Sequence, residues 1–370
     1  MGGMSRLRSD RFGWARYGLS TATCLIAISG IFLGGSALAI SILVIIGTGF
    51  VLDDLIGDEH LQTDRPPAFF CNANLYLAAP LLILLSIVHM LLVKRNGHWE
   101  SGSVLEVAAA TALVGYLYAL LGATVGHEFV HRTDNLPASI CANILFAFTF
   151  NTSFAVFHLA GHHRYVATLR DPASARRGET WMAFLLRTVW CQTAMAVNVE
   201  AARLRRHGQY WVSWQNRILR GQIYTAAILA LAYSLAGLKG MLAFLASAFI
   251  GRIVHELVNY IQHYGLVRLE GQPVEDRHTW DCKRVISNAL QYNLPRHADH
   301  HVHADRLFWQ LTSDTGAPAL PYGYQTMVMI ALIPAWWRRL MGPLLLQWDR
   351  ERASPAERRI IEERGWVKLR

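Results

Sequence analysis

Long uncharged stretches dominate the first 260 residues and determine the predicted architecture. Residues 17–52 contain no charged residue and no histidine, which is too long for one membrane span of about 20 residues. The pair Gly34-Gly35 near the middle predicts a tight turn between two helices. Further apolar runs follow at intervals. We therefore expect an all-α integral membrane protein with six transmembrane helices, at about residues 14–33, 36–56, 75–93, 104–126, 218–237 and 240–262.

Composition favours a membrane protein over a soluble one. Hydrophobic residues make up 53% of the 370 residues and charged residues 16%, against roughly 25% charged in an average soluble protein. The net charge of +9 would suggest nucleic-acid binding in a soluble domain, but here it fits arginine-rich cytoplasmic loops, so no nucleic-acid partner is expected. The five cysteines are scattered without a C-x-x-C pair, which predicts neither disulfides nor thiolate metal sites.

Arginine placement predicts the orientation of these helices. Arginines are dense before the first span and between the fourth and fifth spans, so both regions should face the cytoplasm. The four spans between them are the even number that this requires. The chain would form a single membrane domain, with both termini and residues 127–217 and 263–370 in the cytoplasm of a bacterium and the spans in its inner membrane.

Histidine is the unusual residue of this chain, because nine of the sixteen fall into four short groups. Two histidines at i and i+4 lie on one helical face and can reach one ion. The spacing therefore pairs His158 with His162 and leaves His163 free to turn toward a second ion. The four groups are His127 and His131; His158, His162 and His163; His263; and His297, His300 and His301.

Nine imidazoles are too many for one metal ion and suit two, since one structural zinc takes four ligands. Imidazole binds zinc, copper, iron and nickel, so ligand type alone does not select the metal. The segment from His127 through Glu128 to His131 is also the signature of a zinc protease, in which Glu128 would be the general base. That alternative leaves the other seven histidines unexplained.

The second histidine group lies after an uncharged segment that conflicts with the six-span topology. If residues 135–157 crossed the membrane, His158 would lie on the opposite side from His131. A shared metal site requires both on one side. We therefore expect this segment to be re-entrant or interfacial, and Pro137 and the run Asn151-Thr152-Ser153 are consistent with a broken helix.

The histidine groups and their neighbours resemble the membrane-bound alkane 1-monooxygenases and xylene monooxygenases, within the wider group of integral-membrane fatty-acid desaturases and hydroxylases. Asn-Tyr-x-x-His-Tyr-Gly-Leu and the Val-Ala-Thr…Asp-Pro-Ala run are specific to that family. The resemblance covers about residues 53–343. The matching segments are residues 127–132, 158–179, 259–266 and 296–301.

The resemblance implies a di-iron monooxygenase with all nine grouped histidines as catalytic iron ligands. It would use O2 and electrons from rubredoxin or ferredoxin to hydroxylate a terminal methyl or other unactivated C–H of an alkane, alkyl-aromatic or fatty acyl compound dissolved in the bilayer. A desaturase or fatty-acid decarboxylase with the same iron site is the alternative. Arg203, Arg205 and Arg206 are expected to dock an acidic electron carrier.

This chain departs from the family pattern near the histidines. Phe157 and Gln262 replace glutamates that usually precede ligating histidines, and Leu294-Pro295 replaces Leu-Gln. Carboxylates beside ligating histidines orient them and raise their basicity, and Asp171 and Asp299 are the candidates for this role.

The histidines outside the four groups are not expected to bind metal. Arg252, His255 and Glu256 within the sixth span should pair internally. We expect the others to be non-ligands, four of them at the surface: His60, His98, His207 and His278.

Overall fold

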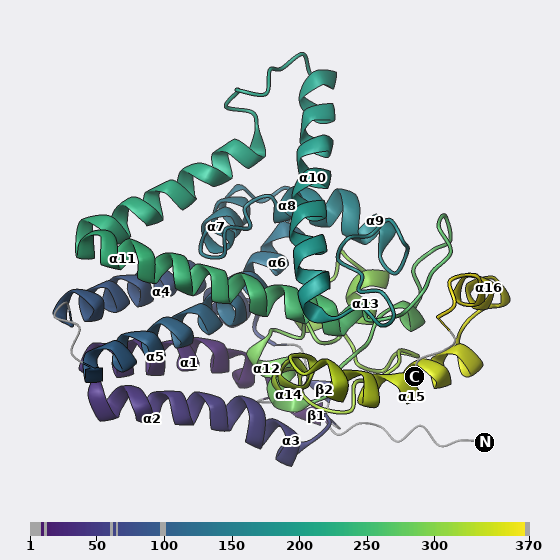
Figure 1. Cartoon of the computed structure of the whole chain (residues 1–370), viewed down its shortest axis with the longest axis horizontal. Coiled ribbons are helices and arrows are strands. Elements are labelled where there is room, and N and C mark those ends of the chain that lie inside the picture. Colours follow the sequence, from purple (N-terminus) through teal and green to yellow (C-terminus); the bar gives the residue numbers. More distant parts are fainter. Residues whose placement is uncertain (1–8, 11–12, 60–61, 64–65, 97–100, 367–370) are drawn as a thin grey trace.

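The computed structural model describes residues 9–10, 13–59, 62–63, 66–96 and 101–366, and most of them are helical. Figure 1 shows long helices lying side by side, with the shorter helices gathered at one end of them. The elements of the N-terminal part are β1 (Ser9–Asp10), η1 (Gly13–Gly18), α1 (Leu19–Leu33), α2 (Gly35–Ile46), η2 (Gly47–Leu52), α3 (Asp53–Ile56), β2 (Gln62–Thr63), α4 (Ala68–Arg95), α5 (Ser101–Leu117), η3 (Tyr118–Ala123) and α6 (Thr124–Val130).

The remaining elements contain three of the four histidine groups. They are α7 (Leu136–Ala147), α8 (Phe154–Phe157), η4 (His158–His162), α9 (His163–Tyr165), α10 (Trp181–Arg206), α11 (Arg217–His263), η5 (Asp276–His278), α12 (Val285–Leu290), α13 (His297–Val302), η6 (Phe308–Gln310), α14 (Tyr324–Ala331), α15 (Pro334–Glu351) and α16 (Pro355–Glu363). The two short strands β1 and β2 pair in parallel.

Five helical stretches among the described residues are long and apolar enough to cross a membrane, and each contains one or two of the predicted spans. They are Gly13–Leu33, Gly35–Ile56, Ala68–Arg95, Gly102–Val130 and Arg217–His263. The prediction of an apolar all-α protein is therefore confirmed. The number of crossings stays a prediction.

The fifth and sixth predicted spans are the two halves of α11. The helix is broken at Ala236 and Gly237, where Gly237 has a φ of 61°. This left-handed conformation favours glycine, which has no Cβ. The 47 residues of α11 correspond to about 70 Å of helix, enough for two passes of a hydrocarbon layer about 30 Å thick.

Close packing of α5 against α11 fixes the second half of α11 within the bundle. A Cβ on Gly115 would lie 2.7 Å from the Cβ of Ile250, and one on Gly251 would lie 2.9 Å from the backbone oxygen of Gly115. Small residues at these positions let the two backbones approach, as is common between membrane helices. The second half of α11 leads directly to His263.

The segment between the first and second histidine groups returns to the point it left. Helix α7 has 12 residues, about 18 Å, and is followed by a turn in which Phe150 has a φ of 52°. The Nε2 atoms of His131 and His158, on either side of the segment, are 3.0 Å apart. A 12-residue helix is too short to cross about 30 Å of hydrocarbon, which supports the expected re-entrant path.

Seven histidines lie outside the groups, and the structure describes five of them. His89 is buried against Thr111, and His207 is exposed at the end of α10. The prediction that His278 lies at the surface is wrong. Its side chain is buried, and its Nε2 atom lies 2.9 Å from Glu357 of α16. His60 and His98 lie outside the described residues.

Candidate metal centre

All nine grouped histidines converge at one end of the helical bundle, in two adjacent sets. Within each set the nitrogen atoms that could bind an ion lie within 4.8 Å of one another. We call them set one and set two. Set one contains His127, His131, His158, His163 and His300, and set two contains His162, His263, His297 and His301.

The two sets are neighbours, since the ring centroids of His163 and His301 are 4.5 Å apart. Their ligands come from four places in the chain: the end of α6, the η4–α9 segment, the end of α11 and α13. The second and fourth groups each contribute to both sets. The arrangement therefore provides two adjacent sets of nitrogens, each of which could hold one ion.

The distribution of the second group differs from the sequence prediction. His158 lies with His163 in set one, with the two Nε2 atoms 3.0 Å apart, whereas His162 lies in set two. The predicted pairing of His158 with His162 is wrong because this stretch is a π-helix. The N–H of His163 donates to the carbonyl oxygen of His158 five residues back, so residues i and i+5 share a face.

Several histidine nitrogens face one another or have no hydrogen-bond donor nearby, so their lone pairs are available to bind a metal ion. In set two, the Nε2 atom of His297 lies 3.1 Å from that of His263 and 3.0 Å from that of His301. In set one, the Nε2 atoms of His127 and His300 are buried without a hydrogen-bond partner among the described residues. A cation between the rings would satisfy these nitrogens together.

Burial favours the neutral form of these imidazoles, which is the form that binds metal. Burial lowers the pKa of His131 to about 4, with a further contribution from His162. Burial and the neighbouring imidazoles also hold the pKa of His158, His163, His300 and His301 well below the ordinary value.

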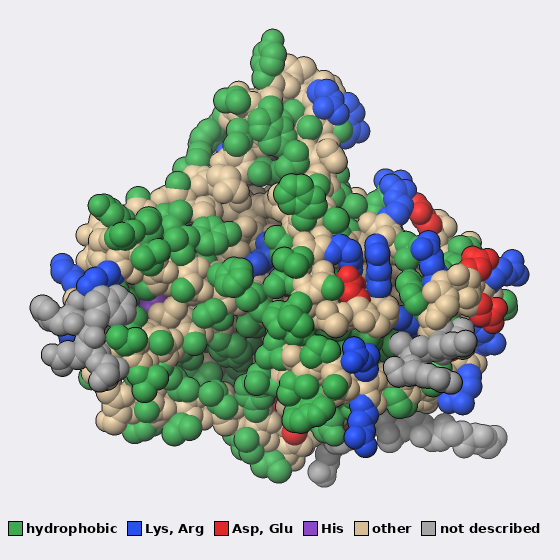
Figure 2. Space-filling model, in the orientation of Figure 1, with side chains coloured by type: hydrophobic (Ala, Val, Ile, Leu, Met, Phe, Trp, Pro, Cys, Tyr) green, Lys and Arg blue, Asp and Glu red, His purple; other side chains and the backbone are tan. Residues whose placement is uncertain are grey.

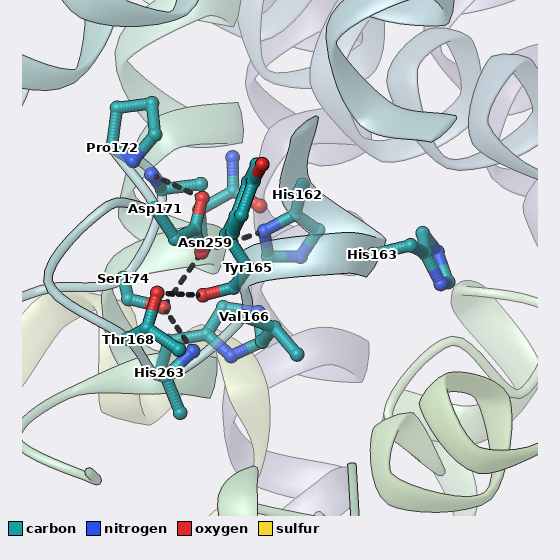
Figure 3. A network of polar contacts seen from close by, with 12 residues as sticks. His162, His163, Tyr165, Val166, Thr168, Asp171, Pro172, Ser174, Asn259 and His263 are labelled. Carbon is teal, nitrogen blue, oxygen red and sulfur yellow. Dashed lines mark hydrogen bonds and ion pairs between the residues drawn. The ribbon is translucent and has the colours of Figure 1, made fainter. Parts of the chain in front are cut away.

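One carboxylate supports a histidine of set two, as predicted for Asp171. Figure 3 shows His162 turned toward Asp171 and His163 directed away from it. The distance from His162 Nδ1 to Asp171 Oδ2 is 2.9 Å. Asp171 is in turn fixed by the Ser174 hydroxyl at 2.7 Å and by the N–H of Ala173 at 3.0 Å. The carboxylate can thus hold His162 with Nε2 free for a metal.

The other carboxylates near the sets do not contact the grouped histidines. Glu128 pairs with Arg132 at 2.9 Å, so its carboxylate is engaged by a guanidinium and not by an imidazole of either set. Asp299 accepts hydrogen bonds from Arg306, His303 and the N–H of Thr312, so its expected role in orienting a grouped histidine is wrong.

The two side chains that replace the family's glutamates are buried and uncharged. Phe157 packs beside His162, with ring centroids 6.2 Å apart. Gln262 donates from Nε2 to the Tyr324 hydroxyl at 3.1 Å.

An apolar cavity of about 220 Å³ ends at the histidines. His127 and His158 of set one and His297 of set two line its inner end. Phe50 of η2 and Met329 of α14 also line it, and Met329 is half exposed on the side of the molecule. The cavity therefore extends from the metal centre toward the outer surface of the bundle.

The charged residues inside the second half of α11 pair with each other, as expected. Arg252 contacts Glu256 at 3.0 Å, and Glu256 also accepts hydrogen bonds from Gln192 of α10 at 2.9 Å and Asn259 at 3.1 Å. The expected pairing of His255 with these residues is wrong, because its ring takes no part in the ion pair and lines the cavity instead. The role of Gln192 was missed, because nothing in the sequence places α10 beside α11.

Comparison with known proteins agrees with this geometry. The model of the family described as fatty acid desaturase matches residues 103–331, which include every grouped histidine. The chain belongs to the fatty acid desaturase family. The predicted resemblance is thereby confirmed.

Several relatives of this desaturase-family chain are similar over most of their length. Alkane 1-monooxygenase 1 of Pseudomonas aeruginosa is 31% identical over 318 residues, covering 82% of this chain and 81% of the relative. The xylene/toluene monooxygenase hydroxylase component XylM of Pseudomonas putida is 30% identical, with 85% of both chains covered. Alkane 1-monooxygenase of Acinetobacter baylyi is 30% identical over 320 residues, covering 83% of this chain and 76% of the relative.

Proposed function

We propose that this chain is a membrane-bound, oxygen-dependent monooxygenase with two non-haem irons, which hydroxylates a terminal methyl or other unactivated C–H group of a hydrophobic substrate. The observation that carries the proposal is the apolar cavity that ends at two sets of buried histidines. The names of the relatives, alkane 1-monooxygenase and xylene/toluene monooxygenase, support this reaction class.

The proposed ligands are the nine histidines of the two sets, five for one iron and four for the other. When bound, the irons would supply O2 activation, which side chains alone cannot provide. The chain's own part is to keep the imidazoles neutral, to fix His162 through Asp171, and to exclude water by burial. The topology proposed for this site is six spans, with the site and both termini in the cytoplasm of the bacterium.

The cavity supports an uncharged substrate. It is lined mainly by apolar side chains such as Leu120, Ile253 and Val258, and its described lining includes no arginine or lysine that could hold a carboxylate. An alkyl chain entering near Met329 would have its terminal methyl directed toward His127 and His158. An alkane or alkyl-aromatic compound is therefore favoured over a free fatty acid.

Electrons would come from an acidic carrier such as rubredoxin or ferredoxin. The arginines expected to dock it lie at the far end of α10, and Arg203 is engaged by Glu200. Exposed Arg164 of α9 and exposed Arg170 and Arg176 of the loop around Asp171 are nearer to set two, and among the described residues only Arg170 of these three is engaged by an acid, Glu270. We propose that the carrier docks on these three arginines.

The test is metal analysis of the purified protein combined with product analysis, using octane, para-xylene and a fatty acid with a rubredoxin and its reductase. We expect about two irons per chain and terminal alcohols from the hydrocarbons. An alkene product or a shortened hydrocarbon would support desaturation or decarboxylation instead, and one zinc without iron would refute the proposal. Replacing Arg164, Arg170 and Arg176 with glutamine should raise the carrier concentration for half-maximal turnover more than replacing Arg203, Arg205 and Arg206.

A further inference from the structure

A second cavity lies on the other side of the histidine-bearing segments from the substrate cavity. It has a volume of about 170 Å³ and is enclosed by the end of α6, by α7, by the α8–η4 segment and by the first turn of α11. Its lining includes Arg132, Arg217 and Arg220 and, among the described residues, no aspartate or glutamate. Figure 1 shows that the α10–α11 hairpin projects from the rest of the molecule here.

Positive charge in this cavity exceeds the available negative charge. Arg217 shares the single carboxylate of Glu200 with Arg203, so two guanidinium groups face one acid. The guanidinium of Arg220, half-buried in the wall, has no ion pair or hydrogen bond within the described part of the chain. Arginine binds phosphate through paired N–H groups, so an unpaired guanidinium in a cavity is suited to that group.

The rest of the lining suits the apolar part of a lipid. Val130, Ala155, Val156 and Leu159 form one wall, and Leu159 is 37% exposed. The polar wall is formed where α11 lies tightly on the turn after α7. A Cβ on Gly221 would come within 2.5 Å of Thr152 Cβ and 3.3 Å of Asn143 Oδ1. The cavity thus has a cationic end and an apolar side.

The position of the cavity corresponds to the headgroup level of a membrane. Arg217 is the first residue of the apolar stretch Arg217–His263, and the loop just before it exposes Tyr210, Val212 and Trp214 by 86%, 85% and 73%. Figure 2 shows apolar side chains at this projecting tip with basic side chains beside them. Exposed aromatic residues and arginines together are typical of the membrane–water interface, and basic pockets between membrane helices bind anionic headgroups.

We propose that this cavity binds the phosphate group of an anionic phospholipid of the surrounding leaflet, with Arg220 as the principal contact. The lipid would brace the first two histidine groups from outside, because Arg132 follows His131 and Leu159 follows His158 in the chain. The site is separate from the proposed reaction, so its occupancy can be measured without turnover.

The test uses the full-length protein in nanodiscs of phosphatidylcholine, with or without phosphatidylglycerol. Phosphatidylglycerol should raise the apparent Tm of the wild type by about 3 °C or more. Arg220→Gln should abolish the shift and retain about tenfold less phosphatidylglycerol in native mass spectrometry. Arg359→Gln, an exposed arginine on α16, is the control and should behave as the wild type.

Two outcomes would overturn the proposal. Equal shifts in all three proteins would show that Arg220 does not recognise the lipid, and an equal shift with inorganic phosphate alone would refute the lipid as the ligand. A photoactivatable phosphatidylglycerol tests the wild type without relying on a variant. Cross-links should fall within residues 129–159 or 217–220, and labelling confined to other segments would contradict the assignment.

Discussion

Asp171 makes the two histidine sets chemically different. Its carboxylate contacts His162 of set two, whereas Asp299 and Glu128 bind arginines and not grouped histidines. A carboxylate bound to the distal nitrogen of an imidazole raises the basicity of the ligating nitrogen. An ion in set two would therefore have fewer imidazole ligands than an ion in set one. One of these ligands, His162, would be more basic than the others.

We expect Asp171→Asn to weaken metal binding in set two about 10- to 100-fold while leaving set one occupied. The variant keeps the shape of the side chain and removes its charge. Iron titration followed by Mössbauer spectroscopy would resolve the two sites. The comparison is Asp299→Asn, and an equal loss of iron in that variant would show that the contact with His162 is not the cause.

At the level of single residues, the nine histidines that the sequence singles out all lie in the two sets, but the sequence does not show which set each one joins. Residue type and clustering are visible in a sequence, whereas the partner of each imidazole depends on backbone hydrogen bonding. The distinction between Asp171 and Asp299 was likewise hidden, since both are acidic residues close to histidines. Only the fold shows that Asp299 is occupied by Arg306 and Thr312.

Among the helices, η4 and α13 present histidines in the same way despite different spacing. In α13, His297 and His301 share set two and His300 belongs to set one. In the η4–α9 segment, His158 and His163 share set one and His162 belongs to set two. The π turn contains one additional residue. Histidines five residues apart therefore lie on one face of it, as histidines four residues apart do in an α-helix.

Deleting exposed Ala160 should therefore restore an α-helical turn and leave about two irons per chain. The flanking residues can stay in place because the deletion removes the additional residue of the π turn. Deleting Ala298 from α13 should instead rotate His300 and His301 by about 100° and abolish binding to both sets. Metal analysis of the two purified proteins decides between these outcomes, and loss of iron in the Ala160 deletion would contradict the argument.

Helix α16 is attached through the buried pair of Glu357 and His278. Burial alone would raise the pKa of Glu357, but its hydrogen bonds with His278 and the N–H of Ser354 and the charge of Arg277 lower it to about 2. A lowered pKa means that the ionised side chain stabilises the folded state. This stabilisation is complete above the ordinary value of 4.5 and is lost as the pH falls from there toward 2.

We expect the amides of α16 to exchange with solvent faster at pH 3.5 than at pH 6, after correction for the intrinsic rate. Glu357→Gln should exchange fast at both pH values, because it lacks the ionised form. Exposed Glu363→Gln on the same helix should keep the wild-type pH dependence. Identical protection in all three proteins would show that the pair does not hold the helix.

For the whole molecule, apolar runs predicted the long helices because helix length must match membrane thickness. The break at Ala236 and Gly237 lies between the predicted fifth and sixth spans, because an apolar stretch of 47 residues is too long for one crossing. The cavities could not be predicted, because each is lined by segments far apart in the chain. The path of residues 135–157 was predicted from the requirement that His131 and His158 lie on the same side of the membrane.

The re-entrant path predicts that residues on either side of it are accessible from one face of the membrane. With exposed Cys191 replaced by serine, Asp134→Cys and Arg176→Cys should both react with an impermeant maleimide only in inside-out vesicles. Both positions are exposed, so accessibility is set by the membrane. Reaction of the two positions from opposite faces would refute the six-span topology together with the shared site.

The wide separation of the nine histidines in the chain also constrains how the protein is made. Set one needs His127 together with His300, and set two needs His162 together with His301. Neither set is complete during synthesis until the ribosome has made α13. With the proposed metals, membrane insertion of the early helices would precede metal uptake, and a chain truncated before residue 297 would lack His297, His300 and His301 and could complete neither set.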